Sequence, residues 1–233
     1  TLPQEPWFFG ALALGFLFIV VFLVMALTAQ KNGVSVASVA GKMSVVIPIV
    51  FGIVLYGESL TLFKVIGILL ALIAVYLTSV KEGNIISKKH NLLFPVLLFF
   101  GSGAVDTTIK YVEKNYVEED AVAIFSGSLF GFAAFFGLLI YGFKSIKKRE
   151  AFGVKNIIAG IILGIPNYYS IVFLIKALQN DAFESSTLFT INNVGVVVVS
   201  TIVGFFLFKE KFNLKNKIGV CLAIIGIILV TIA

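Results

Sequence analysis

The sequence predicts an all-α polytopic membrane protein that is built from inverted repeats of helices. The 233 residues are 59% hydrophobic and 13% charged, with a mean hydropathy of +1.06. Soluble domains are closer to about 45–50% apolar and about 25% charged, so a water-soluble globule is excluded. Two further observations favour this fold: the apolar residues form long unbroken runs, and the segment around Glu58 recurs near the C-terminus.

Eight runs are long enough to cross a bilayer, because about 30 Å of hydrocarbon requires about 20 residues of helix. Helices are expected rather than a β-barrel because the runs do not alternate with a period of two. The connections are short, and the longest, 143–155, leaves no room for an extramembrane domain. The spans are expected at about 7–30, 33–56, 62–80, 91–110, 120–142, 156–178, 184–208 and 214–233.

The net charge of +6 would suggest a nucleic-acid partner in a soluble protein. Here the basic residues lie in short loops between apolar runs, which is where membrane topology places them. We therefore expect a multi-pass protein of the cell (plasma) membrane, with the lipid bilayer and a small molecule as partners and no nucleic acid. The positive-inside rule places both ends of this chain outside.

An internal repeat relates the two ends of the chain. The segment from Gly57-Glu58 to Gly67 matches the segment from Lys209-Glu210 to Gly219, at an offset of 152 residues. Five spans separate equivalent helices, and because five is odd the two copies must have opposite orientations in the membrane. Inverted repeats are typical of secondary transporters, whose substrate sites lie near the midplane. Residues 1–83 are then three spans of the first repeat, and 84–233 are the five spans of the second.

These segments resemble the EamA-like branch of the drug/metabolite transporter superfamily. The resemblance rests on Pro48, the Gly57-Glu58 pair and Gly67, and on the second copy that runs through Glu210 to Gly219. It implies ten spans in two five-helix repeats, and transport of small organic molecules without nucleotide hydrolysis. Because the first copy here has three spans, we expect two helices before Thr1, matching the sixty positions of 91–150.

Lys42 is the main candidate for substrate binding. It lies well inside the second span, where a lysine costs roughly 2.5–3.5 kcal/mol on insertion scales. Lining a cavity, its ammonium group would favour an anionic or carbonyl-bearing substrate. The alternative is a lysine that extends to the interface or pairs with a helix carbonyl.

Other polar residues inside spans are further candidates. Asn192 and Asn193 occupy nearly the repeat-equivalent place to Lys42, and the alternative is interhelical hydrogen bonding, worth about 0.6 kcal/mol on average. Asn167, Tyr168 and Tyr169 follow a proline in the sixth span and face either a cavity or a neighbouring helix. We expect Lys42 and Asn193 to line one central site, with Tyr168 close to it.

Two prolines and the acidic residues complete the candidates. Pro48 and Pro166 are either hinges or tolerated kinks, because proline removes a helix hydrogen bond. Asp106 either pairs with Lys110 at i, i+4 or acts as a proton-coupling carboxylate. The repeated acids, Glu58 and Glu210, are expected to make structural contacts at loops.

The sequence favours a secondary transporter for a small organic metabolite that works by alternating access between the repeats. No catalytic residue, cofactor or metal site is expected, because no nucleophile–base, metal-ligand or phosphate-loop pattern occurs. The alternatives are a non-transporting membrane scaffold or receptor subunit, which would need no polar cavity, and an intramembrane enzyme, which would need paired acid and base residues. The substrate, the coupling ion and a homo-oligomeric state are left open.

Overall fold

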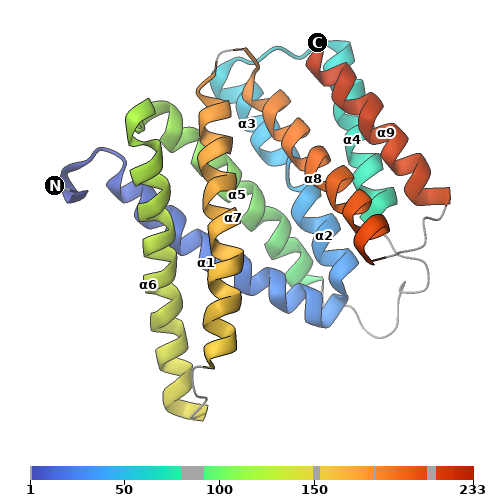
Figure 1. Cartoon of the computed structure of the whole chain (residues 1–233). Helices are drawn as coiled ribbons and strands as arrows, with labels where there is room; N and C mark the ends of the chain where they lie inside the picture. Colours follow the sequence, from blue (N-terminus) through green and yellow to red (C-terminus); the bar gives the residue numbers. More distant parts are fainter. Residues whose placement is uncertain (1, 80–91, 149–152, 181, 209–213) are drawn as a thin grey trace. The chain divides into compact units, whose positions relative to one another are not determined.

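A computed structural model of the chain describes residues 2–79, 92–148, 153–180, 182–208 and 214–233. All regular secondary structure in these ranges is helical, which confirms the predicted all-α class. Two short 3-10 helices, η1 (Leu2–Gln4) and η2 (Glu119–Ala121), accompany the α-helices. The α-helices, drawn in Figure 1, are α1 (Phe8–Asn32), α2 (Val34–Met43), α3 (Val46–Tyr56), α4 (Leu62–Ser79), α5 (Leu93–Tyr116), α6 (Val122–Lys148), α7 (Val154–Leu178), α8 (Ser185–Phe208) and α9 (Leu214–Thr231).

Each of the eight predicted runs corresponds to helix, with α2 and α3 together forming the second span. Within the described ranges, five stretches are long and apolar enough to cross a membrane: Phe8–Asn32, Val36–Tyr56, Leu93–Tyr116, Glu119–Phe143 and Val154–Leu178. Shorter apolar helices cover Leu62–Leu77, Ser185–Val199 and Lys217–Thr231. At about 1.5 Å per residue, the 18 residues of α4 reach about 27 Å, close to the hydrocarbon thickness. The chain is therefore an integral membrane protein with several spans.

The second span is broken near its middle. Pro48 has no backbone N–H, so the carbonyl of Ser44 loses its usual helical donor four residues on. That carbonyl instead accepts from Ile47 (2.9 Å), and the carbonyl of Lys42 accepts from Val45 (3.4 Å). The regular helix resumes when the N–H of Ile49 donates to the Val45 carbonyl. The sequence predicted one continuous span with a hinge or a kink, and the structure places a turn at Ser44 and Val45, four and three residues before the proline.

The fourth span is longer than predicted: α5 continues past residue 110 to Tyr116. The added turns contain charged residues that satisfy one another. The Lys110 ammonium donates to Glu113 (3.0 Å) and to the carbonyl of Leu178 (3.2 Å), the last residue of α7. Because these charges are paired, the helix extends beyond the point where the apolar run ends.

The chain divides into two compact units that interleave along the sequence. One unit comprises Thr1–Phe22 and Thr108–Asn180, and the other comprises Leu23–Thr107 and Asp181–Ala233. We call them the aromatic unit and the charged unit, after the features described below. Their boundaries differ from those of the predicted repeats, each of which contributes to both units, so the division into repeats stays a prediction.

In the charged unit, α4 and α9 lie side by side along their length (Figure 1). A Cβ atom on Gly67 would lie 2.9 Å from the carbonyl oxygen of Gly226 and 3.0 Å from the backbone nitrogen of Val230. The two backbones therefore touch at this point. Beside it, Ala71, Ala74, Ala223 and Val194 form a buried apolar cluster that also includes α8. Small residues permit such close approach between membrane helices.

In the aromatic unit, rings from α1 pack edge-on against rings from α6. Three such pairs join the two helices, with centroid separations of 5.4–5.7 Å: Phe8–Phe132, Phe16–Phe136 and Phe18–Phe130. Gly15 lies between them, where a Cβ atom would meet the backbone nitrogen of Ala133 at 2.9 Å. Edge-to-face ring pairs add to the energy of burial. In contrast, a Cβ atom added to any of four glycines that share a helix-contact spacing in the sequence would meet nothing within 4 Å: Gly127, Gly131, Gly160 and Gly164.

Candidate functional site

The broken span brings a lysine and an aspartate together. Lys42 is in the last turn of α2 and Asp106 is on α5, near enough for the charge of one to act on the other. The helices approach closely beside this pair, because a Cβ atom on Gly103 would lie 2.7 Å from the Cβ atom of Ile47. Asp106 is one helical turn beyond Gly103. Both charged residues are only partly exposed and lie within segments long enough to span the membrane.

The predicted alternative of an Asp106–Lys110 pair along the surface of α5 is not what the structure shows. The Lys110 ammonium bonds to Glu113 and to the Leu178 carbonyl, as described above. The charge that acts on Asp106 is that of Lys42. Charged residues inside membrane spans are rare and commonly paired, because an unpaired charge in the membrane is costly.

The asparagines of α8 differ from each other in their surroundings. Asn193 is buried at 6% exposure, and its amide donates to the Phe189 carbonyl of its own helix at 3.0 Å. Asn192 is exposed. Neither is hydrogen-bonded to Lys42 among the described residues, although all three belong to the charged unit. A shared site with Lys42 therefore stays a prediction.

The polar-aromatic residues of α7 lie in the aromatic unit. The Tyr168 hydroxyl donates to the Ala123 carbonyl of α6 at 3.2 Å, and its ring contacts Phe130. Tyr169 is half exposed and stacks on Phe173, and Asn167 is partly buried. The helix continues through Pro166 without interruption. These contacts give Tyr168 a role in helix packing, and its predicted proximity to Lys42 stays a prediction.

Glu58 caps the start of α8. Its carboxylate accepts hydrogen bonds from the backbone N–H groups of Ser185 (3.0 Å) and Ser186 (2.9 Å), and also from the Ser185 hydroxyl. The predicted structural contact at the loop is therefore observed for Glu58. Gly52 makes room for it, because a Cβ atom there would lie 2.8 Å from a carboxylate oxygen of Glu58. Glu210 lies outside the described residues.

Glu184 makes the reciprocal connection. Its carboxylate accepts from the backbone N–H of Ser59 (2.9 Å), from the Ser59 hydroxyl (3.1 Å) and from the ammonium group of Lys64, which is 1% exposed. Partial burial acts to raise the pKa of Glu184, but the bonds from Lys64 and Ser59 outweigh it and hold the pKa below its usual range. We call this set the loop latch: Glu58, Ser59, Lys64, Glu184, Ser185 and Ser186.

Sequence reasoning missed Glu184 and Lys64 as partners. An acidic residue directly before Ser185-Ser186 is a helix-start pattern, but such a pattern identifies only local capping. The partner lies 120 residues away, which no spacing rule indicates. Among the described residues, no group of three or more His, Cys, Asp or Glu side chains could hold a metal ion.

The fold defines a polytopic helical membrane protein. Residues 1–80 match the EamA-like transporter family. The chain is also 30% identical over 218 residues to an uncharacterized protein of Haemophilus influenzae, covering 93% of this chain and 72% of that protein. A crystal structure of another protein shares the fold, with a TM-score of 0.73 and 15% identity, over 98% of this chain and 79% of the other.

This chain belongs to the EamA-like transporter family, as its sequence motifs predicted. It is a membrane transporter of the drug/metabolite type, with a small-molecule substrate and a lipid environment. The similarity to the solved structure, at 15% identity, supports the fold.

Proposed function

We propose that this protein moves a small organic metabolite across the plasma membrane by alternating access, with its substrate site at the broken second span. The observation that supports this most strongly is the Lys42–Asp106 pair beside the break between α2 and α3. Transporter sites are typically formed where a membrane helix is discontinuous. Charged residues at that depth also mark substrate and ion pathways.

Each residue has a distinct role in this proposal. The Lys42 ammonium binds an anionic or carbonyl group of the substrate. This substrate group competes with the Asp106 carboxylate for the positive charge of Lys42. Asp106, once released from Lys42, takes up a proton and couples transport to the proton gradient. Asn193 and Asn192 add hydrogen bonds that are weaker than those of the charged groups. Pro48 keeps the break open as a hinge when the repeats rock against each other.

The first experiment identifies a ligand. Purified protein is heated with organic acids, amino acids, sugars and nucleosides, because a ligand that binds the folded state raises its melting temperature by mass action. The compound that gives the largest shift is then tested for uptake into proteoliposomes. We expect a compound with a carboxylate or carbonyl group.

Two variants then test the site. Lys42→Ala abolishes uptake, whereas Lys155→Ala, which removes an exposed lysine at the start of α7, leaves uptake unchanged. Asn193→Ala weakens binding less than Lys42→Ala. Normal uptake by Lys42→Ala would contradict the proposed site.

A third variant tests coupling. Asp106→Asn prevents accumulation driven by a pH gradient but retains exchange of substrate across the membrane, because an amide cannot carry the proton. Gradient-driven accumulation by Asp106→Asn would show that another group couples transport.

A further inference from the structure

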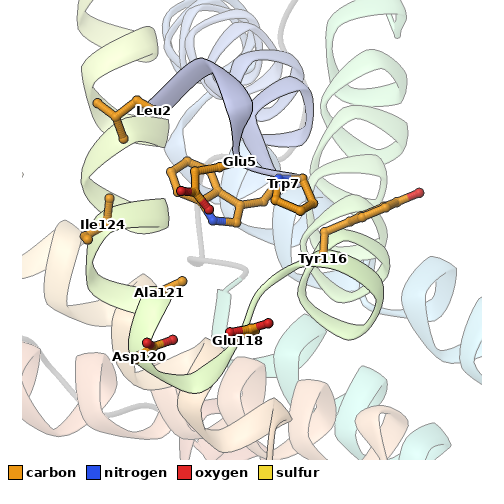
Figure 2. Close-up of a pocket in the computed structure, with 9 residues that line it drawn as sticks. Leu2, Glu5, Trp7, Tyr116, Glu118, Asp120, Ala121 and Ile124 are labelled. Carbon is orange, nitrogen blue, oxygen red and sulfur yellow. The ribbon is translucent and has the colours of Figure 1, made fainter.

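A pocket lies in the aromatic unit, between the segment before α1 and the turn between α5 and α6. Its volume is about 290 Å³, near the lower end of small-molecule sites. Figure 2 shows Glu5 and Trp7 on one side of it and Glu118 and Asp120 on the other. All its lining residues belong to the same unit.

The pocket is negatively charged, and its carboxylates have no bonding partner among the described residues. Glu5, Glu118 and Asp120 line it, and no lysine or arginine is among its described lining residues. Glu118 precedes η2 but makes no capping hydrogen bond with its side chain. Among the described residues, none of the three carboxylates has a hydrogen-bond or ion-pair partner. The pocket therefore attracts a cation.

Trp7 provides an independent observation. The residue is 2% exposed and its ring packs edge-on against Phe125 of α6, with centroids 5.7 Å apart. Its indole N–H is buried and has no hydrogen-bond partner in the described part of the chain. In Figure 2 the indole nitrogen lies on the side of the ring that faces Ala121 across the pocket. Buried donors are rarely left unpaired, so the site lacks an acceptor that a ligand would supply.

The remaining lining restricts the ligand further. Leu2, Tyr116 and Ile124 also line the pocket and add apolar surface beside the carboxylates. Aromatic faces attract ammonium groups and also cover carbon skeletons. A bare metal ion would use neither the apolar surface nor the indole donor.

We propose that this pocket binds a small organic ammonium compound that carries a hydrogen-bond acceptor near its charge, such as an amino alcohol. The ammonium group lies between Glu118 and Asp120, and the acceptor receives the Trp7 N–H. The site is separate from the proposed Lys42 site, because it lies in the other unit and recognises the opposite charge.

Trp7 makes the test direct, because it is the single tryptophan of the sequence and reports on its own pocket. The protein is titrated with ethanolamine, with ethylamine, which lacks the acceptor, and with ethylene glycol, which lacks the charge. Indole fluorescence is followed, with calorimetry as a second measurement of Kd. We expect a saturable change with ethanolamine, a Kd several-fold higher with ethylamine, and no saturation with ethylene glycol.

Variants separate a built site from general surface charge. Glu118→Gln and Asp120→Asn each raise the Kd for ethanolamine, and together they raise it at least about tenfold, because each removes a charge-assisted hydrogen bond. Glu119→Gln is the matched control: this acid lies between the other two in sequence but lines a different pocket, with Lys176 and Gln179. It should change the Kd by less than about twofold.

Trp7→Phe keeps an aromatic ring and removes the N–H. By calorimetry it should bind ethanolamine no better than the unaltered protein binds ethylamine. The proposal is overturned if no ammonium compound saturates the signal, if Glu119→Gln weakens binding as much as Glu118→Gln, or if Trp7→Phe leaves the preference for ethanolamine intact.

Discussion

Two helix contacts in the charged unit are each built around a glycine, and they differ in what that glycine faces. At the α4–α9 contact, Gly67 faces the backbone of Gly226 and Val230. Where α5 meets the broken span, Gly103 faces the side chain of Ile47, next to the Lys42–Asp106 pair. The first contact is fixed because backbone atoms cannot move aside. The second is only partly adjustable, because the Cδ1 atom of Ile47 can rotate away whereas its Cβ atom, 2.7 Å from the new methyl position, moves only with the backbone.

The largest effect is expected when the fixed contact is filled. Gly67→Ala places a methyl group against backbone atoms, so α4 and α9 must separate, and the free energy of unfolding should fall by about 3 kcal/mol. Denaturant unfolding in mixed micelles measures this. The matched control is Gly131→Ala, where open space awaits the methyl group and the gain in helix propensity should raise stability by up to about 1 kcal/mol. Equal effects of both variants would refute the distinction.

The charged pair should show a coupling energy of about 2 kcal/mol in a double-mutant cycle of Lys42→Met and Asp106→Asn. Either single change leaves the other group at depth without its partner, whereas the double variant removes both charges. The unfolding free energies of the four proteins give the coupling directly. Additive single effects would mean that the two charges do not depend on each other.

Filling the partly adjustable contact at Gly103 should cost less than filling the fixed contact at Gly67. Gly103→Ala is expected to lower the unfolding free energy by about 1–2 kcal/mol, because the end of the Ile47 side chain can rotate away although its Cβ atom cannot. Adding Ile47→Val removes the Cδ1 atom, which lies nearest to the new methyl position, and should recover part of the loss. No recovery in the double variant would indicate that backbone, not side chain, opposes the methyl group.

The smallest effect is expected at the loop latch, and it should depend on pH. Because the folded-state pKa of Glu184 is lowered, its contribution to stability is fully present above the usual glutamate range, near about 4.3, and is lost as the pH falls through the lower folded value. The Glu184 side chain is 38% exposed, so solvent screening limits the effect to about 0.5 kcal/mol. Acid unfolding curves of the unaltered protein and of Glu184→Gln measure it, and identical acid limbs would contradict the prediction.

The sequence predicts the positions of the helices well because hydropathy and helix length are local properties of the chain. It also indicates Glu58, since this acid recurs at the repeat offset, and the structure shows how its carboxylate fits: Gly52 makes room for it. The sequence does not predict which charged residues become partners. Lys42 and Asp106 are separated by most of three helices, and spacing along α5 favoured Lys110 instead.

The break in the second span was only partly predictable. Pro48 indicates a lost hydrogen bond, but whether a helix bends or stops depends on whether the freed groups find other partners. Here the carbonyl of Gly41 finds such a partner, because the Ser44 hydroxyl donates a hydrogen bond to it at 2.6 Å. Pro166 lies in an equally apolar helix that continues through it. The pocket beside Trp7 could not be predicted from the sequence, because its lining residues come from two segments that are far apart in the chain. The unpaired indole N–H of Trp7 is visible only in the structure.

The loop latch also has a consequence for how the protein is made. Glu58 and Ser185 are 127 residues apart, so the ribosome has to add all of these residues before the carboxylate can meet its helix. At about 5–20 residues per second, the wait is roughly 6–25 seconds. During that time α3 and α4 are already synthesised, whereas the helix that Glu58 caps is not. A carboxylate at the end of a helix can remain hydrated without a protein partner, whereas an unpaired carboxylate in the middle of the membrane would be costly. Because Glu58 lies in a loop, it can stay charged from the time it is synthesised until α8 is made and capped by it.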